Sequence, residues 1–363
     1  MNENTKNLNK LLQDSGSSYN ATSVEALIQG IAAAPIAIDD EWLTLVSEAP
    51  SVGLKAALLS MLDEAASSNC GLDGERTQAN RIAALRKQMS EQQVDGFIVP
   101  RCDAHQGEYV SLNSERLAWL TGFTGSAGMA IVLKQKAAVF VDGRYTLQAQ
   151  AEVDETLFEI CPMADLPATD WAGRALLPDH RLAYDPWLLT PVQVTRFQSA
   201  AKKAGAELVP ISINLVDQVW SDRPQDPISP IRVQTTPFNG QSSADKRMKI
   251  GNGLANKDAD AVFLSAPDSI AWLFNIRGAD VPFTPFALSF ALLKADGTAC
   301  WFVDQRKLMS DVENHLGNGV TICAPDQLET ALEKLGSEKA TVYASPSEHP
   351  AWVFQKLEKS GAK

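Results

Sequence analysis

The sequence predicts two consecutive α/β domains, each with a mixed sheet flanked by helices, preceded by a small helical extension. Three observations lead to this fold class: the length, the alternation of helical and strand patterns after residue 76, and a long internal repeat. At roughly 150 residues per domain, a chain of 363 residues favours two or three domains. Hydrophobic residues make up 45% and charged residues 21%, which permits a sizeable core and excludes wholesale disorder.

Residues 1–75 form an acidic extension of distinct composition. They contain three lysines, no arginine and eleven acidic residues, so −8 of the chain's net charge of −12 lies in its first fifth. Residues 1–20 are rich in Asn and Ser, and we expect them to be loosely ordered. Apolar residues at helical spacing then predict helices that begin near residues 23, 40 and 54, and residues 67–71 are expected to form a linker. The extension is therefore expected to be a helical hairpin or bundle.

Residues 76–225 are predicted to form the first α/β domain. A helix at 76–91 places Ile82, Leu85 and Met89 on one face, and the apolar run at 96–99 is typical of a buried strand. The remaining patterns predict helices at 116–120, 142–150 and 191–204, strands at 129–133, 137–141 and 181–185, and an extended end at 208–210.

Four prolines between residues 222 and 240 mark a domain boundary, and a second α/β domain is predicted over 240–363. Its elements repeat the order of the first domain. Asp95-Gly-Phe-Ile-Val, Leu117-Ala-Trp-Leu and two strands ending at Asp142 are matched by Asp260-Ala-Val-Phe-Leu, Ile270-Ala-Trp-Leu and two strands ending at Asp304. A repeat this long predicts two domains of one fold rather than a solenoid. The expected elements are a helix at 243–256 and strands at 261–265, 287–294 and 298–303.

Charge and hydropathy exclude several classes of partner. The chain has 32 basic against 44 acidic residues, whereas nucleic acid and anionic membranes require clustered Lys and Arg. It contains no stretch of about 18 apolar residues and no secretory signal at its polar N-terminus. Its five cysteines are scattered and form no Cys-x-x-Cys pair, which suits a reducing compartment. A cytoplasmic location is therefore expected.

The loop after the 96–99 strand carries the most unusual cluster of polar residues. Asp103, His105 and Glu108 lie within six residues, where α/β sheets place functional loops. An acid, an imidazole and a second acid could transfer protons. Alternatively, His105 and Glu108 tie the loop down through hydrogen bonds or an ion pair.

A second candidate group, Asp142-Gly-Arg-Tyr145, lies at a strand-to-helix turn. Asp142 is expected to cap the helix, and Arg144 could bind a carboxylate or phosphate. The alternative for Arg144 is an internal salt bridge.

Other conspicuous residues are predicted to be structural. The segment at 122–128 follows a helix and precedes a strand, whereas a phosphate-binding loop follows a strand and precedes a helix. The segment also lacks the Gly-x-Ser-x-Gly spacing that would make Ser126 a nucleophile. Trp272 and Phe274 are expected in the core. None of the four histidines lies at helical spacing from another, so nothing in the sequence points to a metal site.

The chain contains, in this order, the stretches Asp103-Ala-His-Gln-Gly-Glu-Tyr, Gly122-Phe-Thr-Gly-Ser-Ala-Gly, Asp142-Gly-Arg-Tyr, Asn214-Leu-Val-Asp-Gln-Val-Trp, Asp222-Arg-Pro and Ile270-Ala-Trp-Leu-Phe-Asn-Ile-Arg-Gly. Together these six stretches resemble the N-terminal half of cytosolic-type aminopeptidase P, the Xaa-Pro aminopeptidases of the creatinase/prolidase superfamily. The resemblance covers about residues 78–363, whereas residues 1–75 match nothing in the family pattern. It implies two creatinase-N-like domains, in agreement with the internal repeat.

The resemblance also implies what this chain lacks. In the family a pita-bread domain follows the two N-terminal domains and holds two divalent metal ions, typically manganese, through two Asp, one His and two Glu. This chain ends at Lys363, before such a domain, so the pita-bread domain and the metal site are expected to be absent from it. The segment at 341–346 resembles a late strand of the second domain, which is therefore expected to be truncated at its C-terminus.

By resemblance, the parent enzyme is a metallopeptidase that removes the N-terminal residue before a penultimate proline. This chain would supply scaffold and substrate-access domains and be inactive alone, without tightly bound manganese and with no catalytic residues of its own. His105, Glu108, Arg144 and Tyr145 are the substrate-access candidates. Short proline-containing peptides are the implied partners, and the full-length enzyme is implied to be a homodimer. The alternative is a non-catalytic, peptidase-like interaction module.

Overall fold

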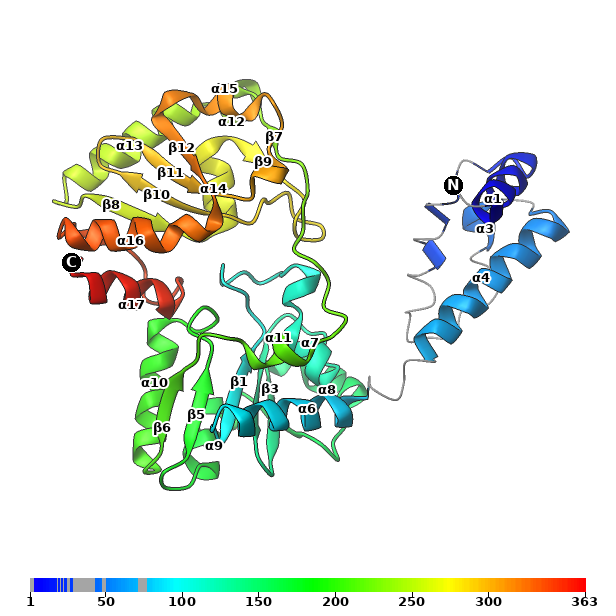
Figure 1. Ribbon diagram of the computed structural model, residues 1–363, viewed down its shortest axis with the longest axis horizontal. Coiled ribbons are helices and arrows are strands. Elements are labelled where there is room, and N and C mark those ends of the chain that lie inside the picture. The colour runs from blue at the N-terminus through cyan, green and yellow to red at the C-terminus, as the bar shows by residue number, and fades with distance from the viewer. Residues whose placement is uncertain are drawn as a thin grey trace. The chain divides into compact units, whose positions relative to one another are not determined.

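The computed structural model describes residues 3–17, 19, 21, 23–24, 27–28, 43–47, 50–70 and 77–363. The chain divides into two compact units, Met1–Asn80 and Arg81–Lys363. The second unit contains two sheets of similar design, one in each half, which we call domain I and domain II (Figure 1).

The first unit is helical, as the spacing of its apolar residues predicts. Among its described residues, the helices with defined bounds are α1 (Glu3–Asp14), α3 (Leu43–Val46) and α4 (Val52–Cys70). Leu8, Leu12, Leu54 and Leu58 are among the residues that form its buried core.

Two expectations for this unit are wrong. Residues 1–20 are not loose throughout, because Leu8 and Leu12 lie one helical turn apart and are buried in the contact of α1 with α4. Residues 67–70 do not form a linker, because α4 continues to Cys70 and no Gly or Pro follows Gly53 within the helix. The helical pattern expected over residues 29–42 lies outside the described residues.

A six-stranded sheet forms the centre of domain I. The strand order is β4-β3-β2-β1-β5-β6, with β1 antiparallel to β2 and parallel to β5, so the sheet is mixed, as predicted. The strands are β1 (Gly96–Pro100), β2 (Gly128–Leu133), β3 (Ala137–Val141), β4 (Glu159–Pro162), β5 (Arg181–Tyr184) and β6 (Glu207–Pro210).

Helices cover both faces of this sheet, which explains why β1 is apolar throughout. Phe97 and Val99 pack into the core cluster of the first face, whereas Ile98 packs into the cluster of the opposite face. The first face is covered by α6 (Gln78–Glu91), α7 (Arg116–Thr121), α8 (Thr146–Glu152) and α11 (Leu215–Val219), and the second by α9 (Ala168–Ala175) and α10 (Pro191–Lys203). Ile82, Leu85 and Met89 of α6 are buried, as predicted.

Domain II repeats this design with five strands in the order β12-β11-β10-β8-β13. The central pairs β8–β10 and β10–β11 are antiparallel and the outer pairs are parallel, as in domain I. The predicted repeat of two mixed sheets is therefore confirmed. The strands are β8 (Ala261–Leu264), β10 (Phe290–Lys294), β11 (Ala299–Phe302), β12 (Val320–Cys323) and β13 (Val342–Tyr343).

The helices of domain II also lie on both faces of its sheet. One core cluster includes Ile270 of α14 (Pro267–Phe274) and Val312 of α15 (Val312–Leu316), and the other includes Leu332 and Val353. Remaining elements are α12 (Thr236–Asn239), α13 (Ser243–Ala255), α16 (Leu328–Ser337), α17 (Ala351–Ser360) and the short pair β7 (Arg232–Val233) and β9 (Ile276–Arg277).

The repeat extends to individual hydrogen bonds beside the last strand of each sheet. Glu207, the first residue of β6, donates its amide to His180 O (2.8 Å) beside β5. In the same way Lys363 donates its amide to Ala340 O (2.9 Å) beside β13, and its carbonyl accepts from Val342 N (2.8 Å). Lys363 thus forms the same kind of backbone hydrogen bond beside β13 that Glu207 forms beside β5.

The core prediction holds for Phe274 and fails for Trp272. Phe274 is buried on α14 together with Ile270 and Leu273, whereas Trp272 lies on the opposite side of this helix and is 47% exposed. The side chain of Lys246 covers its ring, with Nζ 4.4 Å from the ring centroid. An aromatic residue on the exposed face of a helix can therefore pack against a cationic side chain instead of entering the core.

The glycine-rich segment at 122–128 is a structural turn, as predicted. Phe123 is fully buried in the domain I core, and Gly125 and Gly128 lie against its ring. A Cβ atom added at Gly125 would lie 2.3 Å from Phe123 Cζ. The glycines are needed because only a hydrogen atom fits between the chain and the ring.

We predict that Gly125→Ala lowers the free energy of unfolding of the second unit by about 1–3 kcal/mol, because the buried ring cannot move away from the new methyl group. Gly143→Ala is the control, since nothing lies within 4 Å of a Cβ atom at that position. Urea unfolding of both variants measures the difference. Equal stabilities would contradict the packing role of Gly125.

Candidate functional site

Aromatic side chains join domains I and II. Trp187, in the loop after β5, stacks on Trp352 of α17 with ring centroids 4.1 Å apart and lies 5.6 Å from the ring of Phe290 in β10. The first amides of α17 donate to domain I carbonyls, Ala351 N to Leu189 O (2.8 Å) and Trp352 N to Pro186 O (2.9 Å). Helix α17 thus packs on α16 of its own domain and also contacts α10 (Figure 1).

A cleft of about 430 Å³ lies between the two domains. His105 lines it from domain I, with its ring 4.5 Å from that of Phe290 and its Nδ1 2.9 Å from Ser265 O. His105 therefore connects its loop to domain II. Clefts at domain interfaces are common ligand sites, and this one has both aromatic and charged walls.

The structure does not assemble the proton-transfer group considered for the 103–108 loop. Asp103 is buried and accepts from the amides of His105 (2.9 Å) and Gly107 (3.5 Å), so its carboxylate shapes the loop. His105 bonds to domain II, and Glu108 accepts from Ser126 Oγ (3.3 Å) on the exposed side. Each side chain holds a different part of the loop, which agrees with the alternative that they tie it down.

Paired charges line the cleft on the domain I side. Arg116 donates from Nε and Nη2 to both oxygens of Asp217 (2.7 and 2.9 Å), and Arg223 lies 2.9 Å from the same carboxylate. Asp185 accepts from Asn214 Nδ2 (2.9 Å), and burial raises the pKa of this carboxyl. Sequence reasoning did not single out Arg116, Asp185 or Arg223 as site residues. Arg116 lies 101 residues from Asp217, and Arg223 Nε donates to Asn113 O, which is 110 residues away.

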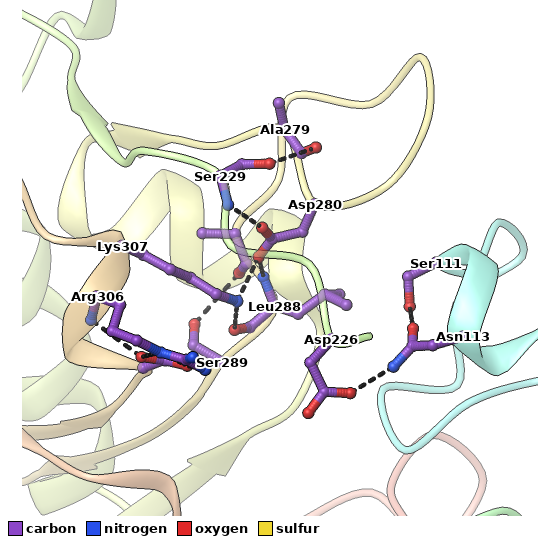
Figure 2. A network of polar contacts seen from close by, with 12 residues as sticks. Ser111, Asn113, Asp226, Ser229, Ala279, Asp280, Leu288, Ser289, Arg306 and Lys307 are labelled. Carbon is purple, nitrogen blue, oxygen red and sulfur yellow. Dashed lines mark hydrogen bonds and ion pairs between the residues drawn. The ribbon is translucent and has the colours of Figure 1, made fainter. Parts of the chain in front are cut away.

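The linker between the domains is fixed by a second polar network (Figure 2). Asn113 donates to Asp226 on the linker, and the Ser229 amide donates to Asp280 (3.2 Å). Asp280 also accepts from Leu288 N and Lys307 Nζ (both 2.7 Å). Both members of the Lys307–Asp280 ion pair are buried, with side chains 6% and 0% exposed.

Three of the four predicted access residues gather on the surface of domain I. Tyr145 Oη lies 2.8 Å from Ser126 Oγ, which donates to Glu108, and the guanidinium carbon of Arg144 lies 5.3 Å from the Tyr145 ring. Arg144 Nε donates to Asp142 (2.8 Å), so the internal salt bridge is the interpretation that the contacts favour. This hydrogen bond also lowers the pKa of Asp142. Ser126 was missed as a member of this group, since only tertiary structure brings it to Tyr145.

The same turn recurs in domain II, which shows that it is part of the shared fold. Asp142 caps the turn before α8 by accepting from Arg144 N, as predicted, and Asp304 accepts from Arg306 N at the end of β11. Arg306 Nε lies 3.0 Å from Asp304, whose pKa is lowered to about 2 mainly by these hydrogen bonds. Lys307 occupies the position of Tyr145 but is buried, whereas Arg306 is 66% exposed, as Arg144 is.

The described residues offer no ready metal centre, and the Cys102 thiol is not activated. Among them, no three His, Cys, Asp or Glu side chains converge on a point that could hold a metal ion. Burial raises the pKa of the Cys102 thiol to about 12, so this cysteine stays protonated and is a poor nucleophile. None of the described helices combines the length and the apolar character that crossing a membrane requires.

Comparison with known families agrees with this architecture. Two models described as the creatinase/prolidase N-terminal domain match residues 81–219 and 222–363. The chain belongs to this family. The two matches fall on domains I and II, so the chain carries the family domain twice in tandem.

Curated relatives of this chain are named Xaa-Pro aminopeptidase P or aminopeptidase P. A probable Xaa-Pro aminopeptidase P of Coccidioides posadasii (strain RMSCC 757 / Silveira) is 36% identical over 266 residues, which cover 72% of this chain and 43% of that protein. Aminopeptidase P1 of Lotus japonicus is 32% identical over 284 residues, 77% of this chain and 43% of that protein. The chain therefore spans less than half the length of these relatives.

A solved structure shares the arrangement of both domains. The X-prolyl aminopeptidase of Caenorhabditis elegans, described as a cytosolic enzyme with a di-nuclear active site, matches with a TM-score of 0.72 and 26% identity. The match covers 76% of this chain and 48% of that chain.

We predict that Asp280→Asn destabilises domain II by about 3–5 kcal/mol, because it leaves the buried ammonium of Lys307 without a compensating charge. Glu338→Gln is the control, since its pair with Lys334 is 4.0 Å long and exposed and contributes less than about 0.5 kcal/mol. Chemical denaturation gives both values. Adding Lys307→Met to Asp280→Asn should recover part of the loss, and no recovery would argue against the charge explanation.

A pH dependence is expected from His349, just before α17. Its buried Nδ1 accepts from Ser345 N (3.0 Å), which requires a neutral ring, and burial lowers its pKa below 6.5. As the pH falls through 6.5, His349 becomes protonated in the unfolded chain but stays neutral in the folded chain. The free energy of unfolding therefore decreases until the pH passes the lowered pKa of His349 in the folded chain. Asn at this position keeps an acceptor without titrating. Thermal unfolding from pH 7.5 to 5 should show a smaller decrease for His349→Asn than for the wild type, and parallel curves would refute this role.

Proposed function

We propose that this chain is the N-terminal part of a metal-dependent Xaa-Pro aminopeptidase, which removes the N-terminal residue before a penultimate proline. The observation that carries the proposal is the tandem pair of creatinase/prolidase N-terminal domains, shared at 32–36% identity with proteins named as Xaa-Pro or P-type aminopeptidases. The alignments cover 43% of each of these two relatives, so we assign the peptide-bond chemistry to the remainder of the enzyme.

In this proposal domains I and II act as scaffold and substrate-access walls. Helix α17 and the Trp187–Trp352 stack hold the domains as one body, so a surface on either domain keeps its position relative to the other. Glu108, Arg144 and Tyr145 are the proposed substrate contacts. The exposed guanidinium of Arg144 keeps donors beyond the one used by Asp142, and these suit a peptide carboxylate. His105 has a positioning role, since its ring is engaged with domain II.

The proposed aminopeptidase activity also implies a metal cofactor, a class of substrate and an assembly. We propose that two divalent metal ions, manganese by family resemblance, bind outside the described residues, which offer no ligand set for them. Short proline-containing peptides are the proposed substrates, and a homodimer is the proposed assembly of the full-length enzyme. We propose a cytoplasmic location, which the description of the worm enzyme as cytosolic supports.

We predict that the 363-residue chain alone does not hydrolyse Xaa-Pro peptides in the presence of Mn²⁺, whereas a fusion of this chain to the C-terminal remainder of the Coccidioides relative does. Release of the N-terminal residue, followed by mass spectrometry, measures both. In the fusion, Arg144→Ala should raise KM about tenfold while kcat changes little, because the substrate contact is lost without disturbing the chemistry.

Arg306→Ala is the matched control, since it removes the equivalent guanidinium from the domain II turn. Proline-dependent cleavage by the chain alone would overturn the assignment of chemistry to the missing part. A folded but inactive fusion would favour the alternative, a non-catalytic interaction module. Equal KM values for the two arginine variants would remove Arg144 from substrate access.

A further inference from the structure

A basic groove runs between α9 and α10 on the outer side of domain I. Its volume is about 460 Å³, and it forms where Gly173 packs close to Ala200 and lets the two helices approach each other. Trp171 and Phe197, on the opposite sides of these helices, are buried against the sheet. The groove therefore lies on a solvent-facing seam, away from the cleft between the domains.

Three cations without protein partners line this groove. They are Arg174 on α9 and Arg196 and Lys203 on α10. Domain I holds eight arginines between residues 81 and 219, all described, and six of them donate hydrogen bonds to the chain: Arg81, Arg86, Arg101, Arg116, Arg144 and Arg181. The two that do not, Arg174 and Arg196, both face this groove.

The rest of the lining is polar and small. Asp170 is its one carboxylate, so the side chains of the groove carry a net charge of about +2 at pH 7. Thr195 and Ser199 donate to carbonyls of their own helix and can only accept from a ligand. No aromatic or branched aliphatic side chain lines the groove, so it offers charge but no apolar anchor.

We propose that this groove binds an oligophosphate, a small anion with two or more linked phosphate groups. The guanidinium groups of Arg174 and Arg196 can each donate two parallel N–H bonds to a phosphate, and Lys203 adds a positive charge. Arg196 and Lys203 lie seven residues apart on α10, a rise of about 10 Å, with Arg174 facing them from α9. This spread suits a chain of phosphates better than a single phosphate ion.

The alternative ligand of the same charge is an acidic peptide. Peptide sites usually depend on one or two buried side-chain anchors, and this groove has no apolar pocket to receive one. The net charge of −12 disfavours non-specific capture of polyanions, so saturable binding would report a local site.

The test is isothermal titration calorimetry of the full chain with inorganic tripolyphosphate at low ionic strength. We expect one saturable site for the wild type, at least about tenfold weaker binding for the double variant Arg174→Gln/Arg196→Gln, and weaker binding as salt is added. Lys136→Gln/Lys202→Gln is the matched control, since it removes two exposed, unpaired charges of domain I that do not line the groove. The control should bind within about twofold of the wild type, and circular dichroism should show that both variants stay folded.

Four outcomes would overturn the proposal. They are the absence of saturable binding to the wild type, an equal loss in the control variant, equal affinity for single phosphate ions, and tighter binding of tetraglutamate than of tripolyphosphate. None of these measurements depends on peptidase activity, so they test the groove separately from the proposed function.

Discussion

The contact of α17 with the loop after β5 is the interaction on which the arrangement of the second unit depends. Two backbone amides at the start of α17 donate to carbonyls of domain I, and the Trp187–Trp352 stack adds an aromatic contact between the domains. The first-turn amides of a helix have no partner within the helix, so domain I serves here as the cap of a domain II helix. This contact closes one side of the cleft, and the linker network around Asp280 fixes the other.

The two domains show how one fold serves different purposes at equivalent positions. In each domain an Asp-x-Arg turn follows a central strand, Asp142–Arg144 after β3 and Asp304–Arg306 after β11. In both turns the carboxylate caps the turn and pairs with the arginine. The next residue decides the difference. In domain I it is Tyr145, which reaches Ser126 on an open surface, and in domain II it is Lys307, which is buried against Asp280 and fixes the linker. The turn belongs to the fold, and the residue that follows it determines its local use.

Much of the fold could be predicted because local patterns and global topology agree. The run at 96–99 is apolar at every position since both faces of β1 are covered, and the matching order of elements implied the matching sheets. Errors arose where tertiary contacts outweighed local pattern. Residues 3–14 are mostly polar, yet Leu8 and Leu12, one turn apart, are buried where α1 contacts α4. Trp272 is apolar but packs with Lys246.

By itself, the sequence determined the class of fold, the internal repeat and the candidate residues, because these depend on periodicity and on motifs of a few neighbouring residues. Tertiary structure alone decided which candidates act together. It separated His105 from Glu108, although they are three residues apart, and brought Ser126 to Tyr145 and Arg116 to Asp217. It also left Arg174 and Arg196 unpaired on adjacent helices. A side chain's partners depend on where the backbone places it in space, and sequence distance carries little information about that.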